Sequence, residues 1–192
     1  LAALWARVEA AFAERHGRIP GGAFAVLAMG RFGSGRMSFS SDLDLVFIYE
    51  VAGDGGPSDG ERPLEPATYM TRLAQRLIAA VTALTAEGRL YEIDMRLRPS
   101  GNAGPIAISL PGFVSYHQDS AWTWEHMALT RARVVIGDAR LSASITAAVR
   151  SILTRPRDPD TLVVEVDAMR ERIAHEHRTE SPWQLKHARG GL

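Results

Sequence analysis

The sequence predicts an α+β fold in which a mixed sheet with flanking helices is followed by a segment that is helical throughout. The apolar run Phe24–Met29 predicts one central strand. The stretch Ser40–Tyr49 predicts a second, which begins half exposed with alternating acids and ends as a continuous apolar run. Amphipathic helical patterns lie on either side of these runs, and from Leu110 onward the hydrophobic period is helical. We therefore expect a sheet domain over residues 1–138 and the start of a helical domain, resembling part of a bundle, over residues 139–192.

Composition excludes several classes of protein. The 192 residues include 22 basic and 22 acidic side chains, so the net charge is zero and no broad nucleic-acid-binding surface is expected. The absence of Cys excludes disulfides and thiolate metal sites and fits a cytoplasmic location. The sequence contains neither a membrane-spanning apolar stretch nor a signal peptide. Because the chain starts at Leu1 without Met and stops at Leu192, we expect it to be a piece of a longer protein.

The first elements are predicted from the period of the apolar residues and from the Gly and Pro residues that begin or end an element. Leu1–His16 has one apolar side and is followed by Gly17, which predicts a helix that packs on the back of the sheet. Val51–Pro66 is rich in Gly, Pro and Asp and has no period, so we expect a mobile loop near the mouth of the site. Pro66–Ala86 has the apolar stripe of a long helix, which Gly88 would end.

Asp42 and Asp44 stand two residues apart at the start of the second central strand, so their carboxylates leave the same face. Neighbouring carboxylates repel unless a cation lies between them, and this geometry suits Mg²⁺. A pair of solvated acids that open a strand is the alternative. The Gly30–Gly35 turn upstream favours the functional interpretation, because a strand, a Gly-rich turn and an Asp-x-Asp strand form the layout of a nucleotidyltransferase palm.

Arg89–Pro99 alternates apolar with charged residues and is predicted to be one sheet strand. If it pairs with the Asp44 strand, Asp94 becomes a third carboxylate on the same face. Arg96 and Arg98 would then point to the side on which a bound phosphate lies. A ladder of salt bridges without a ligand is the alternative.

The second half of the chain is predicted as a turn, a short strand and then helices. Ser100–Pro105 is the turn and Ile106–Ile108 is a short edge strand. The helical patterns after them cover the residues from Leu110, Trp122–Val135, 139–154 and Pro159–His177.

The chain resembles the bifunctional glutamine synthetase adenylyltransferase (glutamate–ammonia-ligase adenylyltransferase) family. The resemblance lies in Ala28–Ser34, Ser41–Leu45, Tyr91–Gly101 and Ala121–Val135, and Leu185–Leu192 is similar to the segment that follows this domain in the family. Members carry two related palms of the DNA polymerase β-like type, of which one adds AMP to glutamine synthetase and the other removes it by phosphorolysis. The segments Ala121–His126 and Arg98–Gly101 resemble the C-terminal, adenylylating copy.

The resemblance implies attack by a tyrosine hydroxyl of glutamine synthetase on the α-phosphorus of ATP, with two Mg²⁺ ions. It implies that Asp42 and Asp44 bridge the metals and that Asp94 completes one site and helps to take the tyrosine proton. The implied nucleotide-binding residues are Gly30, Gly33, Ser34, Ser41, Arg96 and Arg98. The further partner implied is a nitrogen regulatory signal protein that acts through the full-length enzyme. Neither a nucleic acid nor a membrane is implied as a partner.

This sequence departs from the family in its Gly-rich turn. Arg31, Phe32, Ser34 and Arg36 stand where the family usually has Gly-Lys-Leu-Gly-Gly followed by an acid. Two other classes stay open: a nucleotidyltransferase that acts on a small molecule or an RNA end, and a palm that binds nucleotide only as a sensor.

Several other polar or aromatic residues have a structural interpretation. His175 and His177 diverge on one helix, and solvated histidines are expected rather than a metal pair. Trp122 and Trp124 are expected to anchor the helical part on the sheet. Glu125, Arg131 and Arg133 are expected to form a structural ion network.

Overall fold

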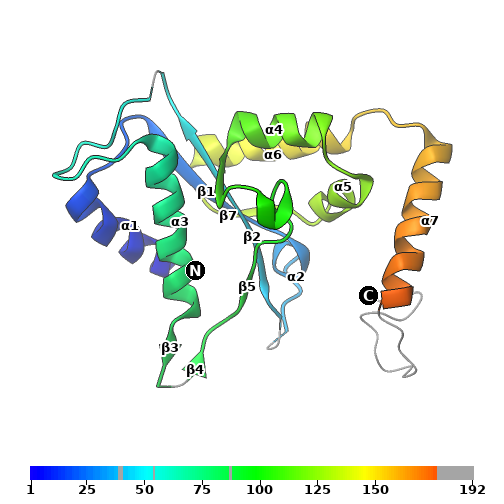
Figure 1. Ribbon diagram of the computed structural model, residues 1–192, viewed down its shortest axis with the longest axis horizontal. Coiled ribbons are helices and arrows are strands. Elements are labelled where there is room, and N and C mark those ends of the chain that lie inside the picture. Colours follow the sequence, from blue (N-terminus) through cyan, green and yellow to red (C-terminus); the bar gives the residue numbers. More distant parts are fainter. Residues whose placement is uncertain (39–40, 54, 87, 177–192) are drawn as a thin grey trace.

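The computed structural model describes residues 1–38, 41–53, 55–86 and 88–176 (Figure 1). Ser40, His177 and the 185–192 segment, all quoted above, lie outside the described residues. A five-stranded mixed sheet has the strand order β5-β2-β1-β7, and β6 also pairs with β2. Helices lie on both faces of the sheet, as the sequence predicts (Figure 1).

Two antiparallel strands form the centre of the sheet. Strand β1 (Gly22–Ala28) pairs with β2 (Leu43–Val51) from Gly22 opposite Val51 to Ala28 opposite Leu45. The four side chains of β2 from Leu45 to Ile48 are at most 1 % exposed. This burial on both faces explains why the sequence reads there as a continuous apolar run.

The edge strand beside β2 is interrupted. Strands β5 (Ile93–Asp94) and β6 (Ala107–Ser109) both run parallel to β2, the first at its start and the second near its end. Residues 95–106 leave the sheet between them and contain the 3₁₀ turn η1 (Gly101–Ala103). The prediction of a continuous Arg89–Pro99 strand is therefore wrong. The chain turns off the sheet because the backbone N–H of Arg98 bonds back to the carbonyl of Met95.

Helices α1 (Ala2–His16) and α3 (Pro66–Thr82) cover one face of the sheet. The ring of Trp5 on α1 stacks on that of Phe24 on β1, with the centroids 4.8 Å apart. Helix α3 ends earlier than predicted. Ala83 is already non-helical, and a small hairpin of β3 (Leu84–Thr85) and β4 (Gly88–Arg89) follows.

Helices α4 (Leu110–Asp119), α5 (Thr123–Leu129) and α6 (Ala139–Leu153) form the second hydrophobic cluster with the other face. The predicted helix over Trp122–Val135 is wrong in its second half. Its last residues form β7 (Arg133–Ile136), which pairs antiparallel with β1. Val134, Val135 and Ile136 are β-branched, so they suit a sheet better than a helix.

The domain boundary expected near Asp138 stays a prediction. The described residues after it form α6 and α7 (Pro159–Glu176) and contain no strand. Yet α6 belongs to the sheet's own core, since Leu141 and Ile145 are fully buried against it. Helix α7 contacts α5, and its Val163 and Val164 are exposed.

The loop after β2 lies at the opposite end of that strand from the carboxylates. Strand β2 has nine residues, and at about 3.3 Å per residue its two ends are roughly 26 Å apart. Backbone N–H groups of Asp59, Gly60 and Arg62 bond to carbonyls at the end of α1 and just beyond it. The expected position near the mouth of the site is therefore wrong.

Candidate active site

Asp44 and Asp94 are register partners on neighbouring parallel strands, β2 and β5. Register partners on adjacent strands point to the same face, about 5 Å apart at the backbone. Asp42 lies just before β2 and is exposed, whereas Asp44 is partly buried. The sequence prediction that Asp94 lies beside Asp44 on one face of the sheet is confirmed.

Gly30 lies directly against the carboxylate of Asp44. Its φ of +52° favours glycine, and a Cβ on it would lie 2.2 Å from Oδ2 of Asp44. The backbone carbonyl of Asp44 also accepts a hydrogen bond of 2.9 Å from the N–H of Met29. The side chain and the backbone of Asp44 thus both contact the start of the Gly-rich turn.

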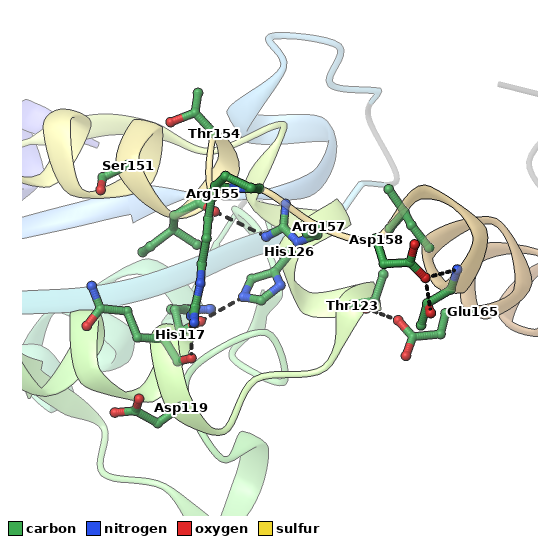
Figure 2. Close-up of a pocket in the computed structure, with 15 residues that line it drawn as sticks. His117, Asp119, Thr123, His126, Ser151, Thr154, Arg155, Arg157, Asp158 and Glu165 are labelled. Atoms are coloured by element: carbon green, nitrogen blue, oxygen red, sulfur yellow. Dashed lines mark hydrogen bonds between the residues drawn. The ribbon is translucent and has the colours of Figure 1, made fainter.

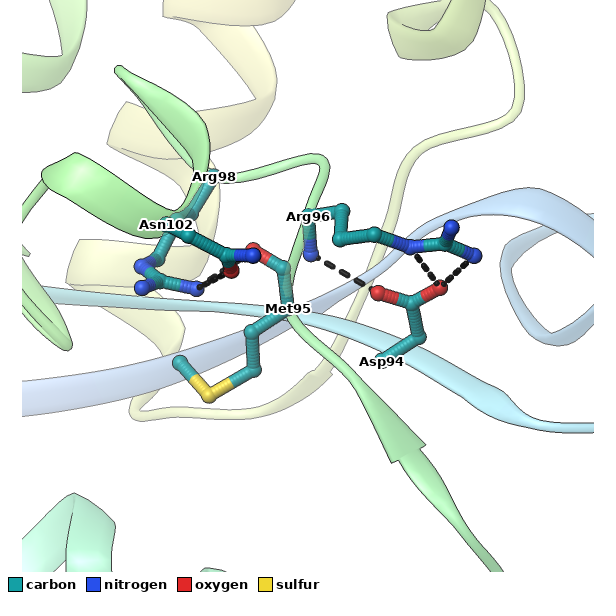
Figure 3. Close-up of polar contacts among 5 residues, drawn as sticks. All are labelled: Asp94, Met95, Arg96, Arg98 and Asn102. Atoms are coloured by element: carbon teal, nitrogen blue, oxygen red, sulfur yellow. Dashed lines mark hydrogen bonds and ion pairs between the residues drawn. The ribbon is translucent and has the colours of Figure 1, made fainter.

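Asp94 has a cationic neighbour, Arg96 (Figure 3). The Arg96 backbone N–H and Nε both donate to this carboxylate, each at 2.8 Å. Burial alone would raise the pKa of Asp94, but the hydrogen bonds from Arg96 and the charges of Arg96 and Arg98 outweigh burial and lower that pKa below its usual value. Asp94 is therefore ionised at neutral pH.

Arg96 and Arg98 do not share a face, because the chain turns between them (Figure 3). Arg96 is exposed, whereas Arg98 is buried and donates from Nη1 to the carbonyl of Met95 at 2.8 Å. The Arg98 side chain also reaches the carbonyl of Gly104 and the side chain of Asn102. Arg98 thus holds the 95–106 excursion together, and the expected alternation of the two arginines is wrong.

The donor set around Asp44 suits a hard cation such as Mg²⁺, since it consists of carboxylate oxygens on two adjacent strands. Among the residues that the structure describes, however, no three His, Cys, Asp or Glu side chains are gathered closely enough to hold a metal. The carboxylate of Asp94 is turned to Arg96. A shared cation would require that carboxylate to exchange its guanidinium partner for the metal.

The Gly-rich turn forms the short helix α2 (Gly30–Gly33). The N–H of Gly33 bonds to the carbonyl of Met29 at 2.7 Å, so it is used inside the turn. Ser34 is exposed, and its hydroxyl donates to the carbonyl of Arg31. Ser41 is buried, and its Oγ bonds to the backbone and hydroxyl of Ser38. Ser41 therefore fixes the approach to β2. Of the two predicted nucleotide-binding serines, Ser34 and Ser41, it is Ser34 that is exposed.

Sequence reasoning missed the contact that holds this turn. Arg133 on β7 donates from Nε to the carbonyl of Gly33 at 2.9 Å and from Nη2 to the carbonyl of Phe32 at 3.0 Å. The expected ion network of Glu125 with Arg131 and Arg133 is wrong, because Glu125 accepts instead from the Tyr116 hydroxyl and the Trp122 N–H. The β-branched run after Arg133 is the signal in the sequence that could have predicted the strand β7.

A separate cleft of about 860 Å³ lies between α4, α5, α7 and the α6–α7 connection (Figure 2). None of the three acids lines it. His117 is 4 % exposed, and neither of its ring nitrogens has a hydrogen-bond partner among the described residues. Burial, with a smaller effect of His126, lowers the pKa of His117 to about 4. His126 donates from Nε2 to the backbone carbonyl of His117 (Figure 2).

Comparisons with known proteins show which proteins this chain is similar to. A family model described as glutamate-ammonia ligase adenylyltransferase matches residues 1–148. A protein of Bradyrhizobium diazoefficiens named bifunctional glutamine synthetase adenylyltransferase/adenylyl-removing enzyme is 52 % identical over 181 residues, which is 94 % of this chain and 18 % of that protein. Proteins with the same name in Brucella suis and Xanthobacter autotrophicus are 50 % and 48 % identical over 96 % and 98 % of this chain. The chain spans about a fifth of the length of these relatives. No helix in the described ranges is long and apolar enough to span a membrane.

Proposed function

The chain belongs to the glutamate-ammonia ligase adenylyltransferase family, and from this premise we propose that it transfers AMP from ATP to a tyrosine hydroxyl of glutamine synthetase. The observation that carries this proposal is the register of Asp44 with Asp94 beside Gly30. Two acids on adjacent strands can bind the metal ions of nucleotidyl transfer, and a glycine turn against one of them can bind the nucleotide beside those ions. We further propose that the sheet is a DNA polymerase β-like palm.

Asp42, Asp44 and Asp94 are the proposed ligands of two Mg²⁺ ions. When bound, such ions stabilise the charge that develops on the entering and leaving oxygens of an in-line displacement. The protein's part is then chiefly positioning. Asp94 is ionised, as its lowered pKa indicates, so its carboxylate can accept a hydrogen bond from the tyrosine hydroxyl and orient it.

Arg96 is proposed to change partners when substrate binds. Its side chain is 76 % exposed while that of Asp94 is 15 % exposed, so the guanidinium can move without disturbing the core. It would leave Asp94 and bind the triphosphate of ATP, for which its fork of donors is suited. Ser34 is proposed to donate its hydroxyl to the same phosphates.

The other predicted binding residues are proposed to shape the chain around the acids rather than to contact the nucleotide. Gly30 and Gly33 allow the turn to approach Asp44 and the 131–133 segment. Ser41 and Arg98 shape the two loops beside the acids. The burial of Arg98 favours a role in shaping its loop over the direct contact with nucleotide that the resemblance implies.

The proposed direction of reaction is AMP addition, because Ala121–His126 and Arg98–Gly101 resemble the adenylylating copy of the family. Removal of AMP by phosphorolysis is the second candidate, and the relatives' printed name includes an adenylyl-removing activity. We place the reaction in the cytoplasm, with a nitrogen regulatory signal protein acting through the full-length enzyme. No nucleic acid takes part in the proposed reaction.

The test is an incubation of the chain with Mg²⁺, glutamine synthetase and ATP labelled at either the α- or the γ-phosphate. The proposal predicts that label from the α-phosphate alone becomes attached to a tyrosine of glutamine synthetase. Asp44→Asn should abolish that transfer. Binding of ATP without transfer would instead indicate a sensor, and label on another acceptor would indicate a different nucleotidyltransferase.

A further inference from the structure

Helices α1 and α3 form a groove that carries four arginines. One part of it is a cavity of about 760 Å³, whose cationic lining residues are Arg15, Arg62, Arg72 and Arg76. An adjoining cavity of about 560 Å³ shares Arg15 and Arg76 with the first and continues along apolar side chains of both helices. Among the described residues, no carboxylate lines either cavity. We call the two cavities together the α1–α3 groove, which combines a cationic part with an apolar part.

The groove arginines lack counter-charges. In the part of the chain that the structure describes, the ion pairs are formed by Arg18, Arg89, Arg96 and Arg140. All four groove arginines are exposed. Arg72 and Arg76 also lie one turn apart on α3, where like charges repel. Carboxylates placed between these arginines would remove that repulsion, and the forked guanidinium groups match carboxylate oxygens.

The segments that carry the arginines are already joined to each other. The N–H of Arg62 bonds to the carbonyl of Arg15 at 3.1 Å, and Nδ1 of His16 donates to the carbonyl of Arg62 at 2.8 Å. The hydroxyl of Tyr69 on α3 donates to the carbonyl of Gly17 at 2.9 Å. The end of α1, the loop before α3 and α3 itself therefore hold the groove in shape before anything binds.

Helix α7 presents a face of the opposite kind. Its Val163 and Val164 are each 67 % exposed, and acidic side chains that include Asp160 and Glu171 are exposed beside them. At 100° per residue, these four positions fall within an arc of about 100°. The other side of α7 is turned to α5, and Glu165 accepts there from the hydroxyl of Thr123. The outer face of α7 thus combines exposed valines with carboxylates, a pattern that marks an interaction surface.

The outer face of α7 complements the α1–α3 groove in charge, in apolar character and in length. From Asp160 to Glu171 the helix rises about 16 Å, and α1 rises about 12 Å from Val8 to His16 along the groove. The two surfaces lie at opposite ends of the molecule, so α7 cannot reach the groove of its own chain (Figure 1). A second copy of the chain can supply it.

We propose that the outer face of α7 docks in the α1–α3 groove of a second copy of this chain. Asp160 and Glu171 would pair with groove arginines, and Val163 and Val164 would cover the apolar part of the groove. Two copies that lie side by side in opposite directions present both surfaces to each other at once, as a two-fold symmetric pair requires. The inference goes beyond the proposed function and does not depend on it.

Analytical ultracentrifugation over a range of concentrations measures the association. A groove-reversed chain, Arg72→Glu with Arg76→Glu, should raise the dissociation constant by about tenfold or more, because like charges then face each other. A helix-reversed chain, Asp160→Arg with Glu171→Arg, should do the same. Arg150→Glu, exposed on α6 outside the groove, is the control and should leave association unchanged. Circular dichroism verifies that each variant is folded.

Mixing the two reversed chains gives the sharpest result. The reversed groove then meets the reversed helix, and the unchanged helix of one chain meets the unchanged groove of the other. The mixture should therefore associate, although each reversed chain alone stays monomeric. A wild-type chain that is monomeric at every concentration would overturn the inference, as would a mixture that fails to associate. Association that neither reversal weakens would show that the copies meet through another surface. None of these readouts requires AMP transfer, so the result is independent of the proposed function.

Discussion

At the scale of the residue, the hydrogen bonds from Arg96 and the charges of Arg96 and Arg98 keep the partly buried Asp94 ionised by lowering its pKa. The lowered pKa adds stability to the folded state that is present above the ordinary pKa of an aspartate and lost as the pH falls through the lowered one. Arg96 is mostly exposed, so this stabilisation is modest. The significance of the pair lies in the charge it keeps beside Asp44.

Asp94→Asn should preserve the fold and reduce AMP transfer. The amide has the same shape and can still accept from the Arg96 backbone N–H, so the melting temperature should change little. Transfer should fall by about 10²- to 10⁴-fold, the usual scale for losing a group that acts on the reacting oxygen. Asp167→Asn, on the exposed side of α7, is the control. Near-normal transfer by Asp94→Asn would contradict the assignment.

His117 should make the protein sensitive to acid. Its pKa is lowered from 6.5 to about 4, so the unfolded chain takes up a proton between these values and the folded chain does not. Stability is therefore lost as the pH falls from about 6.5 to 4, by about 1–2 kcal/mol between pH 7 and 5. His117→Leu keeps a similar volume without a titrating group, so urea unfolding should show a flatter pH dependence. An unchanged slope would show that other groups cause the acid sensitivity.

At the scale of the element, the Gly-rich turn depends on close backbone contacts with β7. A Cβ at Gly33 would lie 2.0 Å from the carbonyl oxygen of Arg131 and 2.6 Å from that of Ala28. Both contacts are with backbone, so neither can be relieved by rotating a side chain. The turn and the 131–133 segment are consequently one packed unit.

Gly33→Ala should destabilise the protein by about 3 kcal/mol or more, since the extra methyl group forces backbone apart. Gly56→Ala serves as the matched control, because nothing lies within 4 Å of a Cβ there. Thermal unfolding of both variants measures the difference. Equal melting temperatures for Gly33→Ala and Gly56→Ala would show that the turn adjusts to a methyl group more easily than its contacts indicate.

The sequence was informative where one local pattern decided the structure. Leu45–Ile48 could be read as a buried strand, and the alternation at Ile93–Asp94 placed Asp94 beside Asp44. Two features could not be read from the periodic pattern, one because of contacts inside a loop and one because of a long-range pairing. The alternation around Arg98 continues in the sequence, but its guanidinium binds carbonyls of its own loop and ends the strand. The helical period through Val135 is overridden because β1 offers an edge for pairing.

At the scale of the whole molecule, Asp44 and Asp94 lie at one end of the central strand β2 and the loop that follows β2 lies at the other end. Helices on both faces bury the central strands, and so the start of β2, the start of β5 and the Gly-rich turn are held by the same core. The cleft around His117 lies on the helical side, apart from the acids. Substrates of the proposed reaction would meet at the end that carries Asp44.

The direction of the reaction, AMP addition or AMP removal, is a prediction about the molecule as a whole. If the chain is the adenylylating copy, it should attach AMP to unmodified glutamine synthetase. It should not release ADP from the adenylylated enzyme when phosphate is added in place of ATP. Chromatography of the nucleotides measures both reactions in parallel. Efficient phosphorolysis without forward transfer would assign the chain to the other copy of the family.

The most direct measurement of the central claim is the binding of Mn²⁺, a paramagnetic substitute for Mg²⁺, followed by electron paramagnetic resonance in wild type, Asp44→Asn, Asp94→Asn and the double variant. If one cation site is shared by β2 and β5, each single substitution should weaken binding, and the two effects should be coupled by about 0.5–3 kcal/mol. Independent, additive effects, or binding that neither substitution changes, would show that Asp44 and Asp94 are neighbours in the sheet without sharing a metal.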